Sequence, residues 1–127
     1  MRPIEIAMRP LSTLVALLIL LLWPALALLG APSPPTVLIK AEEFRFTPKE
    51  ITIRPGEVIF SVKNEGALEH NFAIEDATGK KVAGIASILP EKTDQLRVAL
   101  RVGRYAMVCD LPGHKDAGML GSLTVRE

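Results

Sequence analysis

Four side chains of the types that bind soft metals stand out in the second half of the chain. Cys109 is the only cysteine, and His114 and Met119 follow it in a C-x4-H-x4-M pattern. His70 is the only other histidine, so the chain offers two imidazoles, one thiol and one nearby thioether. Two histidines and one cysteine with a weak axial methionine form the ligand set of electron-transferring copper. These residue types and their spacing therefore predict a metal site.

Each of these residues alone has a simpler structural interpretation. An isolated cysteine or methionine is usually a core residue, and only the combination on one short loop favours a metal. Zinc accepts the same nitrogen and sulfur ligands, but a thioether is a poor zinc ligand, so Met119 favours copper. Four protein ligands also leave no open position for a substrate, whereas catalytic metals keep one. We therefore expect a copper protein that is not an enzyme.

The N-terminal segment differs in composition from the rest of the chain. Arg2 and Arg9 precede an uncharged, leucine-rich stretch, residues 11–31. A basic start followed by an apolar run is typical of an export signal, and Ala25 and Ala27 suit cleavage after Ala27. The stretch is also about as long as the roughly 20 residues that span a membrane, so a retained anchor is the alternative. Either interpretation places the folded domain outside the cytoplasm, on the periplasmic or extracellular side.

Composition divides the chain into three parts. Residues 1–31 are the predicted signal peptide or membrane anchor, residues 32–35 a proline-rich linker, and residues 36–127 one domain of ordinary size. The first part holds two arginines and one glutamate, so removing it lowers the formal charge of +1 to zero. A neutral domain argues against nucleic-acid binding and against long-range steering by a single charged field.

Alternating apolar and polar residues predict β-strands throughout the domain. The pattern is clear in seven segments, residues 37–40, 51–54, 58–63, 70–74, 96–101, 105–108 and 121–125. Strands with turn signals every eight to twelve residues indicate an antiparallel sandwich or barrel. We expect an all-β domain of about seven or eight strands.

Three other segments have less specific patterns. Residues 83–89 have the composition of a single helical turn, which Pro90 would end. The charge pairs Glu42-Glu43 and Lys80-Lys81 are typical of solvated surface. None of these segments is expected to contribute to the site.

Strand periodicity also predicts how the candidate ligands are positioned. His70 begins a strand whose inward side is apolar, and Cys109 lies at the inward-facing end of another. Gly113 and Gly118 allow the two bends that return the loop histidine and methionine toward the thiol. A loop with strands at both ends restricts the movement of its ligands.

The loop resembles the copper loop of the cupredoxins, the small blue-copper proteins. Its C-x4-H-x4-M spacing, with Pro-Gly before the histidine and Gly before the methionine, is similar to the rusticyanin and sulfocyanin branch. The resemblance extends over residues 36–127 through the motifs EFRFTP, RPGE and EHNF. It implies a Greek-key β-sandwich that holds one type 1 copper ion.

The resemblance also implies a role for individual residues. His70, Cys109 and His114 would be equatorial ligands, and Met119 the axial ligand. Asn71 matches a position that often hydrogen-bonds across to the cysteine strand and so orients the ligands. The implied function is to carry single electrons between a donor and an acceptor redox protein through transient contacts, with His114 as the exit. The alternative is a copper carrier, buffer or sensor module without electron transfer.

Overall fold

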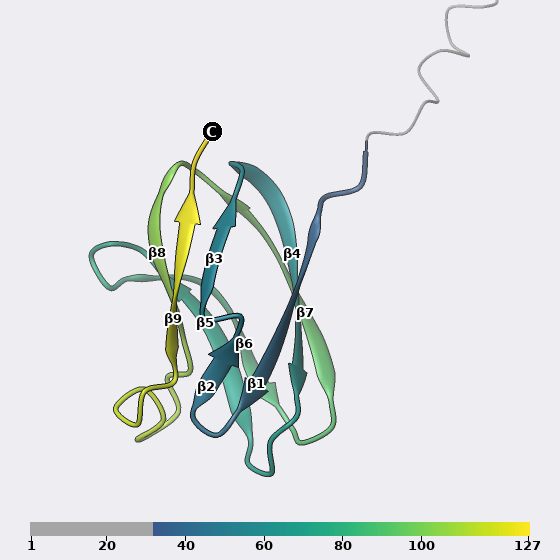
Figure 1. The fold of residues 1–127 in the computed structure, drawn as a ribbon, viewed down its shortest axis with the longest axis vertical. Coiled ribbons are helices and arrows are strands. Elements are labelled where there is room, and N and C mark those ends of the chain that lie inside the picture. Colours follow the sequence, from purple (N-terminus) through teal and green to yellow (C-terminus); the bar gives the residue numbers. More distant parts are fainter. Residues whose placement is uncertain (1–31) are drawn as a thin grey trace, which may run out of the picture. The chain divides into compact units, whose positions relative to one another are not determined.

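The computed structural model describes residues 32–127, and all regular elements in this range are β-strands (Figure 1). In chain order the strands are β1 (Thr36–Glu42), β2 (Arg45–Thr47), β3 (Glu50–Ile53), β4 (Gly56–Asn64), β5 (His70–Glu75), β6 (Lys81–Ile88), β7 (Thr93–Leu100), β8 (Gly103–Val108) and β9 (Leu120–Val125). No helix in this part of the chain could cross a membrane. The predicted signal or anchor, residues 1–31, lies outside the described residues.

The strands form two sheets, which confirms the expected all-β sandwich. One sheet has the order β2-β1-β4-β7 and the other the order β3-β9-β8-β5-β6. Strands that are distant in sequence lie side by side, as in a Greek key. The sheets are mixed rather than purely antiparallel, because β1 runs parallel to β4 and β3 runs parallel to β9.

Residues 32–127 form nine strands instead of the expected seven or eight. Strand β2 has only three residues, too few to show an alternating pattern. Strand β6 occupies the stretch interpreted as a helical turn, and that interpretation is wrong. Its buried residues Ile85 and Ile88 are three positions apart, which imitates helical spacing. They pair with Phe72 and His70 across a register shift, so a β-bulge between them turns both inward.

Buried aromatic rings fill the centre of the sandwich. Phe72 of β5 meets Phe46 of β2 edge to face, with ring centroids 5.5 Å apart, and Phe60 of β4 at 5.6 Å. All three side chains are buried, and such ring pairs stabilise a core beyond the area that they bury. Phe72 lies two residues after His70 on the same strand. The packing of Phe72 in this cluster therefore restricts the movement of the strand that carries the histidine.

The strands that carry or flank the candidate ligands are neighbours in the five-stranded sheet. Strand β8 pairs with β5 on one side and with β9 on the other. His70 is the first residue of β5, Cys109 directly follows β8, and Met119 directly precedes β9. The topology therefore brings the three chain segments to one end of the sandwich.

Candidate metal centre

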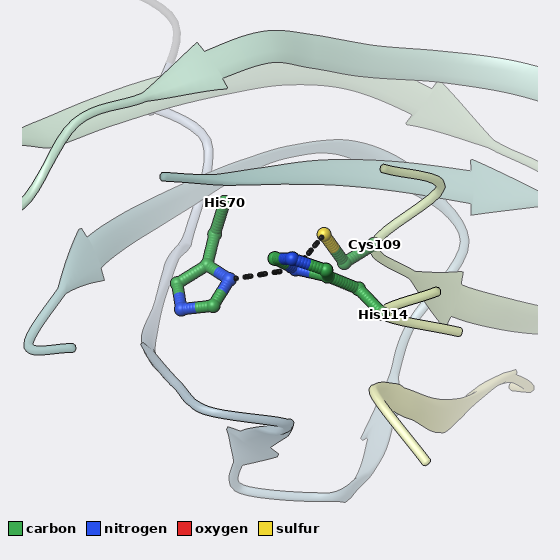
Figure 2. A group of neighbouring side chains, drawn as sticks. All are labelled: His70, Cys109 and His114. Atoms are coloured by element: carbon green, nitrogen blue, oxygen red, sulfur yellow. Dashed lines mark hydrogen bonds between the residues drawn. The ribbon is translucent and has the colours of Figure 1, made fainter. Parts of the chain in front are cut away.

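Three of the four predicted ligands converge on one point (Figure 2). The ligand atoms of His70, Cys109 and His114 all lie within 4.8 Å of one another. The two Nδ1 atoms of His70 and His114 are 3.2 Å apart, and His114 Nδ1 is 3.5 Å from Cys109 Sγ. Both His70 and Cys109 are fully buried, whereas His114 is partly exposed.

These distances fit a trigonal metal site. Metal–nitrogen bonds of about 2.0 Å and metal–sulfur bonds of about 2.3 Å put trigonal donors roughly 3.5 to 3.7 Å apart. The observed separations of 3.2 and 3.5 Å need only small adjustments of the side chains. One thiolate and two imidazoles suit copper or zinc by their chemistry, so the donor set itself fits the ion that the sequence predicts.

Met119 is tied to the other loop ligands through the backbone. Its carbonyl accepts a hydrogen bond of 3.1 Å from the N–H of Cys109, and its N–H donates to the carbonyl of His114 at 3.0 Å. The side chain is fully buried within the core cluster that also contains Cys109. The backbone thus places Met119 beside the cluster, and coordination by its sulfur stays a prediction.

The loop between Cys109 and Met119 is a series of hydrogen-bonded turns. The N–H of His114 donates to the carbonyl of Leu111 at 3.1 Å, and the N–H of Gly118 donates to Lys115 at 3.0 Å. Gly113 and Gly118 have φ angles of +81° and +103°, which residues with a side chain rarely adopt. Both glycines therefore make the bends that the sequence predicts at these positions.

Asn71 connects the strand of His70 to the strand of Cys109. Its Oδ1 accepts a 2.9 Å hydrogen bond from the N–H of Asp110, and its Nδ2 donates to the Asp110 carboxylate. Its own backbone N–H points at Cys109 Sγ, 3.4 Å away. An N–H directed at the sulfur helps to fix the orientation of the cysteine side chain. The effect of Asn71 on a bound metal stays a prediction.

Lys81 was assigned to the solvated surface by the sequence, but it contacts this network. Its Nζ lies 2.6 Å from Oδ2 of Asp110. This contact with Lys81, and then the one with Asn71, holds the pKa of Asp110 below its usual value. No sequence signal links Lys81 to Asp110, because the two residues come together only where β6 and β8 both pair with β5.

Glu43, likewise assigned to the surface, faces His70. Its Oε1 lies 3.3 Å from His70 Nε2 and accepts hydrogen bonds from the N–H groups of Ala67 and Leu68 at 2.8 and 2.7 Å. The bond from Leu68 contributes most to a pKa of Glu43 below its usual value. Burial lowers the pKa of His70, the Glu43 carboxylate opposes this, and His114 lowers it further. Burial therefore disfavours the protonated imidazole, which is the form that cannot bind a metal.

Phe44 is a second neighbour that the ligand pattern did not identify. Its ring meets the His114 imidazole edge to face, with centroids 5.1 Å apart. The His70 and His114 rings are also arranged edge to face, at 5.2 Å. The partly exposed His114 ring thus lies between the apolar ring of Phe44 and the buried ring of His70.

Comparison with known proteins gives the same fold and a related family. The profile of the cupredoxin-like domain family matches residues 11–125. The copper-resistant cuproprotein CopI of Rubrivivax gelatinosus is 29% identical over 106 residues, which cover 70% of this chain and 64% of that protein. The chain thus spans less than two thirds of the length of this relative.

Solved structures of auracyanins share the fold. Auracyanin A, a blue copper protein of Chloroflexus aurantiacus, has a TM-score of 0.67 and 22% identity, covering 74% of this chain and all of that one. The dithionite-reduced auracyanin of Roseiflexus castenholzii has a TM-score of 0.66 and 21% identity, covering 76% of this chain and all of that one. Auracyanin B has a TM-score of 0.69 and 19% identity, covering 77% and 94% of the two chains.

Proposed function

The chain belongs to the cupredoxin-like family, and from that premise we propose that it carries single electrons on one type 1 copper ion. His70, Cys109 and His114 would be the equatorial ligands and Met119 the axial ligand. The observation that carries this proposal is the convergence of two Nδ1 atoms and one Sγ within 4.8 Å. When bound, copper supplies a reversible one-electron change of oxidation state.

The protein residues suit this role because they restrict movement. Backbone hydrogen bonds join Met119 to both Cys109 and His114, and Asn71 joins the cysteine strand to the neighbouring strand. A site held in this way changes little between oxidation states, so each electron transfer requires little rearrangement. Four protein ligands leave no position for a substrate, which argues for a carrier rather than an enzyme.

The partly exposed His114 offers a path to a partner protein. It is the one ligand of the three clustered donors that is not fully buried, and Leu111 lies partly buried beside the core cluster. A small apolar contact around His114 would suit the weak, transient encounters of electron-transfer proteins. We place the protein outside the cytoplasm because residues 1–31 have the pattern of an export signal or anchor.

A second candidate function is copper handling without electron transfer. The similarity to a copper-resistant cuproprotein favours it. A carrier or buffer would bind and release copper readily, whereas an electron carrier would retain it through many redox cycles. The two functions therefore predict different rates of copper loss.

The test is the absorption spectrum of the purified protein with one equivalent of copper(II). We expect an intense colour from thiolate-to-copper charge transfer, bleached by ascorbate and absent from Cys109→Ser. Fast, reversible voltammetry with slow loss of copper(I) to a chelator would support the electron carrier. Rapid loss of copper(I) would support copper handling, and a colourless copper(II) complex would contradict the type 1 site and with it the electron carrier.

A further inference from the structure

Glu43 lies in the turn between β1 and β2, far in sequence from the strand it touches. Its Oε1 is 3.3 Å from Nε2 of His70, on the side of the imidazole opposite to the clustered donors. His70 Nε2 is fully buried, and it is the one buried side-chain polar atom in residues 32–127 without a hydrogen bond of good geometry. The Glu43 carboxylate is thus the group positioned to accept a hydrogen bond from a proton on Nε2.

The Glu43 carboxylate is itself held in one position by hydrogen bonds from the loop between β4 and β5. The N–H groups of Ala67 and Leu68 donate to Oε1 at 2.8 and 2.7 Å. A Cβ at Gly66 would lie within 2.7 Å of Oε2 and 2.8 Å of Cδ, so only glycine leaves room for the carboxylate there. The loop between β4 and β5 therefore fixes Glu43 against the histidine rather than leaving it free in solvent.

The chemistry of histidine makes this contact relevant to metal binding. A neutral imidazole carries its proton on one nitrogen, and a ligand through Nδ1 must carry it on Nε2. An acceptor at Nε2 selects that tautomer, orients the ring and makes Nδ1 more basic. A carboxylate also adds a negative charge, which favours the more positive oxidation state of a bound metal.

We propose that Glu43 is a positioning residue for His70, which holds the proton on Nε2 and favours copper(II) over copper(I) at the site. The part that concerns copper rests on the proposed function, whereas the part that concerns the imidazole does not. The contrasting explanation is that Glu43 only stabilises the loop of residues 65–69 through its hydrogen bonds to Ala67 and Leu68.

Glu43→Gln separates these explanations, because the amide oxygen can still accept both loop hydrogen bonds while the charge is removed. Glu42→Gln is the matched control, since it makes the same charge change one residue away, at a partly exposed side chain that pairs with Arg45 and not with a histidine. In the copper-loaded protein we expect Glu43→Gln to weaken copper(II) binding at least tenfold relative to copper(I). A tenfold change corresponds to a rise in potential of about 59 mV for one electron. Glu42→Gln should leave the potential unchanged.

The second measurement uses the metal-free protein and does not depend on copper. Nitrogen NMR of the imidazole, at a pH well above the usual histidine pKa of about 6.5, reports which ring nitrogen of His70 carries the proton. We expect the Nε2–H tautomer in the wild type and in Glu42→Gln, and a mixture of tautomers in Glu43→Gln. Denaturant unfolding of the three proteins shows whether the loop has been destabilised.

The outcomes are distinct. An unchanged tautomer together with an unchanged potential in Glu43→Gln would overturn the proposal and leave Glu43 as a loop residue. A changed tautomer in a protein that binds no copper would support the positioning of His70 and overturn the proposed function. Equal potential shifts in Glu43→Gln and Glu42→Gln would mean that only net charge matters, and would also overturn the specific role.

Discussion

The two ends of strand β5 are both fixed by hydrogen bonds, but the partners come from different distances along the chain. After β5, Asp76 Oδ1 accepts bonds from the N–H and hydroxyl of Thr78 at 2.9 and 2.6 Å and from the N–H of Lys80 at 3.1 Å. At the start of β5, the partner of His70 Nδ1 is His114, 44 residues away. The turn is local, whereas the site is assembled from distant segments.

This difference shows what each end requires to form. The contacts of Asp76 can form in an isolated hairpin, because aspartate commonly organises a turn of its own backbone. The contacts of His70 need the turn at Glu43, the end of β8 and the loop of His114 to be in place together. The turn should therefore tolerate loss of the core packing better than the site does.

The largest expected effect comes from the core beneath the site. Phe72→Ala removes a fully buried ring that packs on Phe46 and Phe60, and we expect it to lower the free energy of unfolding by about 3 to 5 kcal/mol. Because His70 lies two residues away, copper(II) binding should weaken as well. Denaturant unfolding and copper titration measure the two effects. Unaltered copper affinity in a destabilised protein would mean that the site is independent of the core.

A smaller loss is expected from the connection between the two ligand strands. Asn71→Ala leaves the N–H of Asp110 without its acceptor and should lower the free energy of unfolding by about 1 to 3 kcal/mol. Copper should also dissociate faster, because the cysteine strand loses its support.

The matched change in the local turn is Thr78→Ala, which removes an exposed hydroxyl bonded to Asp76. It should alter stability by no more than about 0.5 kcal/mol and leave copper dissociation unchanged. Denaturant unfolding and transfer of copper to a chelator compare the two variants. Equal effects would contradict the distinction between the two ends of β5.

Met107 and Met119 are both buried, so substitutions at these two positions can be compared with little change in stability. Met119→Leu and Met107→Leu replace fully buried thioethers with a side chain of similar volume, and each should change stability by less than about 1.5 kcal/mol. Loss of a weak axial donor should raise the copper potential in Met119→Leu only, with the colour retained. Voltammetry measures the shift. If neither variant shifts it, Met119 is not a ligand.

The smallest effect is a pH dependence confined to the turn. The Thr78 hydroxyl, and then the N–H groups of Lys80 and Thr78, lower the pKa of Asp76 in the folded protein. A lowered folded pKa stabilises the protein above the unfolded value of about 3.9, and this contribution is lost as the pH falls through the folded pKa. Asp76→Asn should therefore reduce the loss of stability on acidification. Denaturant unfolding curves between about pH 6 and pH 2 measure this pH dependence. Identical profiles for the wild type and Asp76→Asn would mean that the Asp76 carboxylate does not stabilise the turn.

The sequence predicted best what is close together along the chain or follows a regular period. Cys109, His114 and Met119 were recognisable because they lie on one short loop, with a glycine bend before the histidine and another before the methionine. His70 could be added because it is the only other histidine. Strand alternation correctly predicted that the cysteine, which directly follows β8, faces the interior.

The features that the sequence did not reveal depend on packing between distant segments. Glu43 and Lys81 stand in ordinary charge pairs, and only the folded sandwich brings one to His70 and the other to Asp110. The bulge in β6 gives Ile85 and Ile88 a helical spacing, so a periodic pattern gave the wrong element. In each case the contact or the element depends on the segment that packs against these residues, and their own sequence does not reveal it.

The position of β9 also has a consequence for the order of folding. It follows the other eight strands in the chain, yet it lies inside the five-stranded sheet, between β3 and β8. Pairings such as Glu50 with Ser122 join distant residues, and such long-range contacts make folding slow. Until β9 is inserted, β3 and β8 present open edges that can pair with other chains. Because Met119 directly precedes β9, the same step that closes these edges brings the last predicted ligand into place.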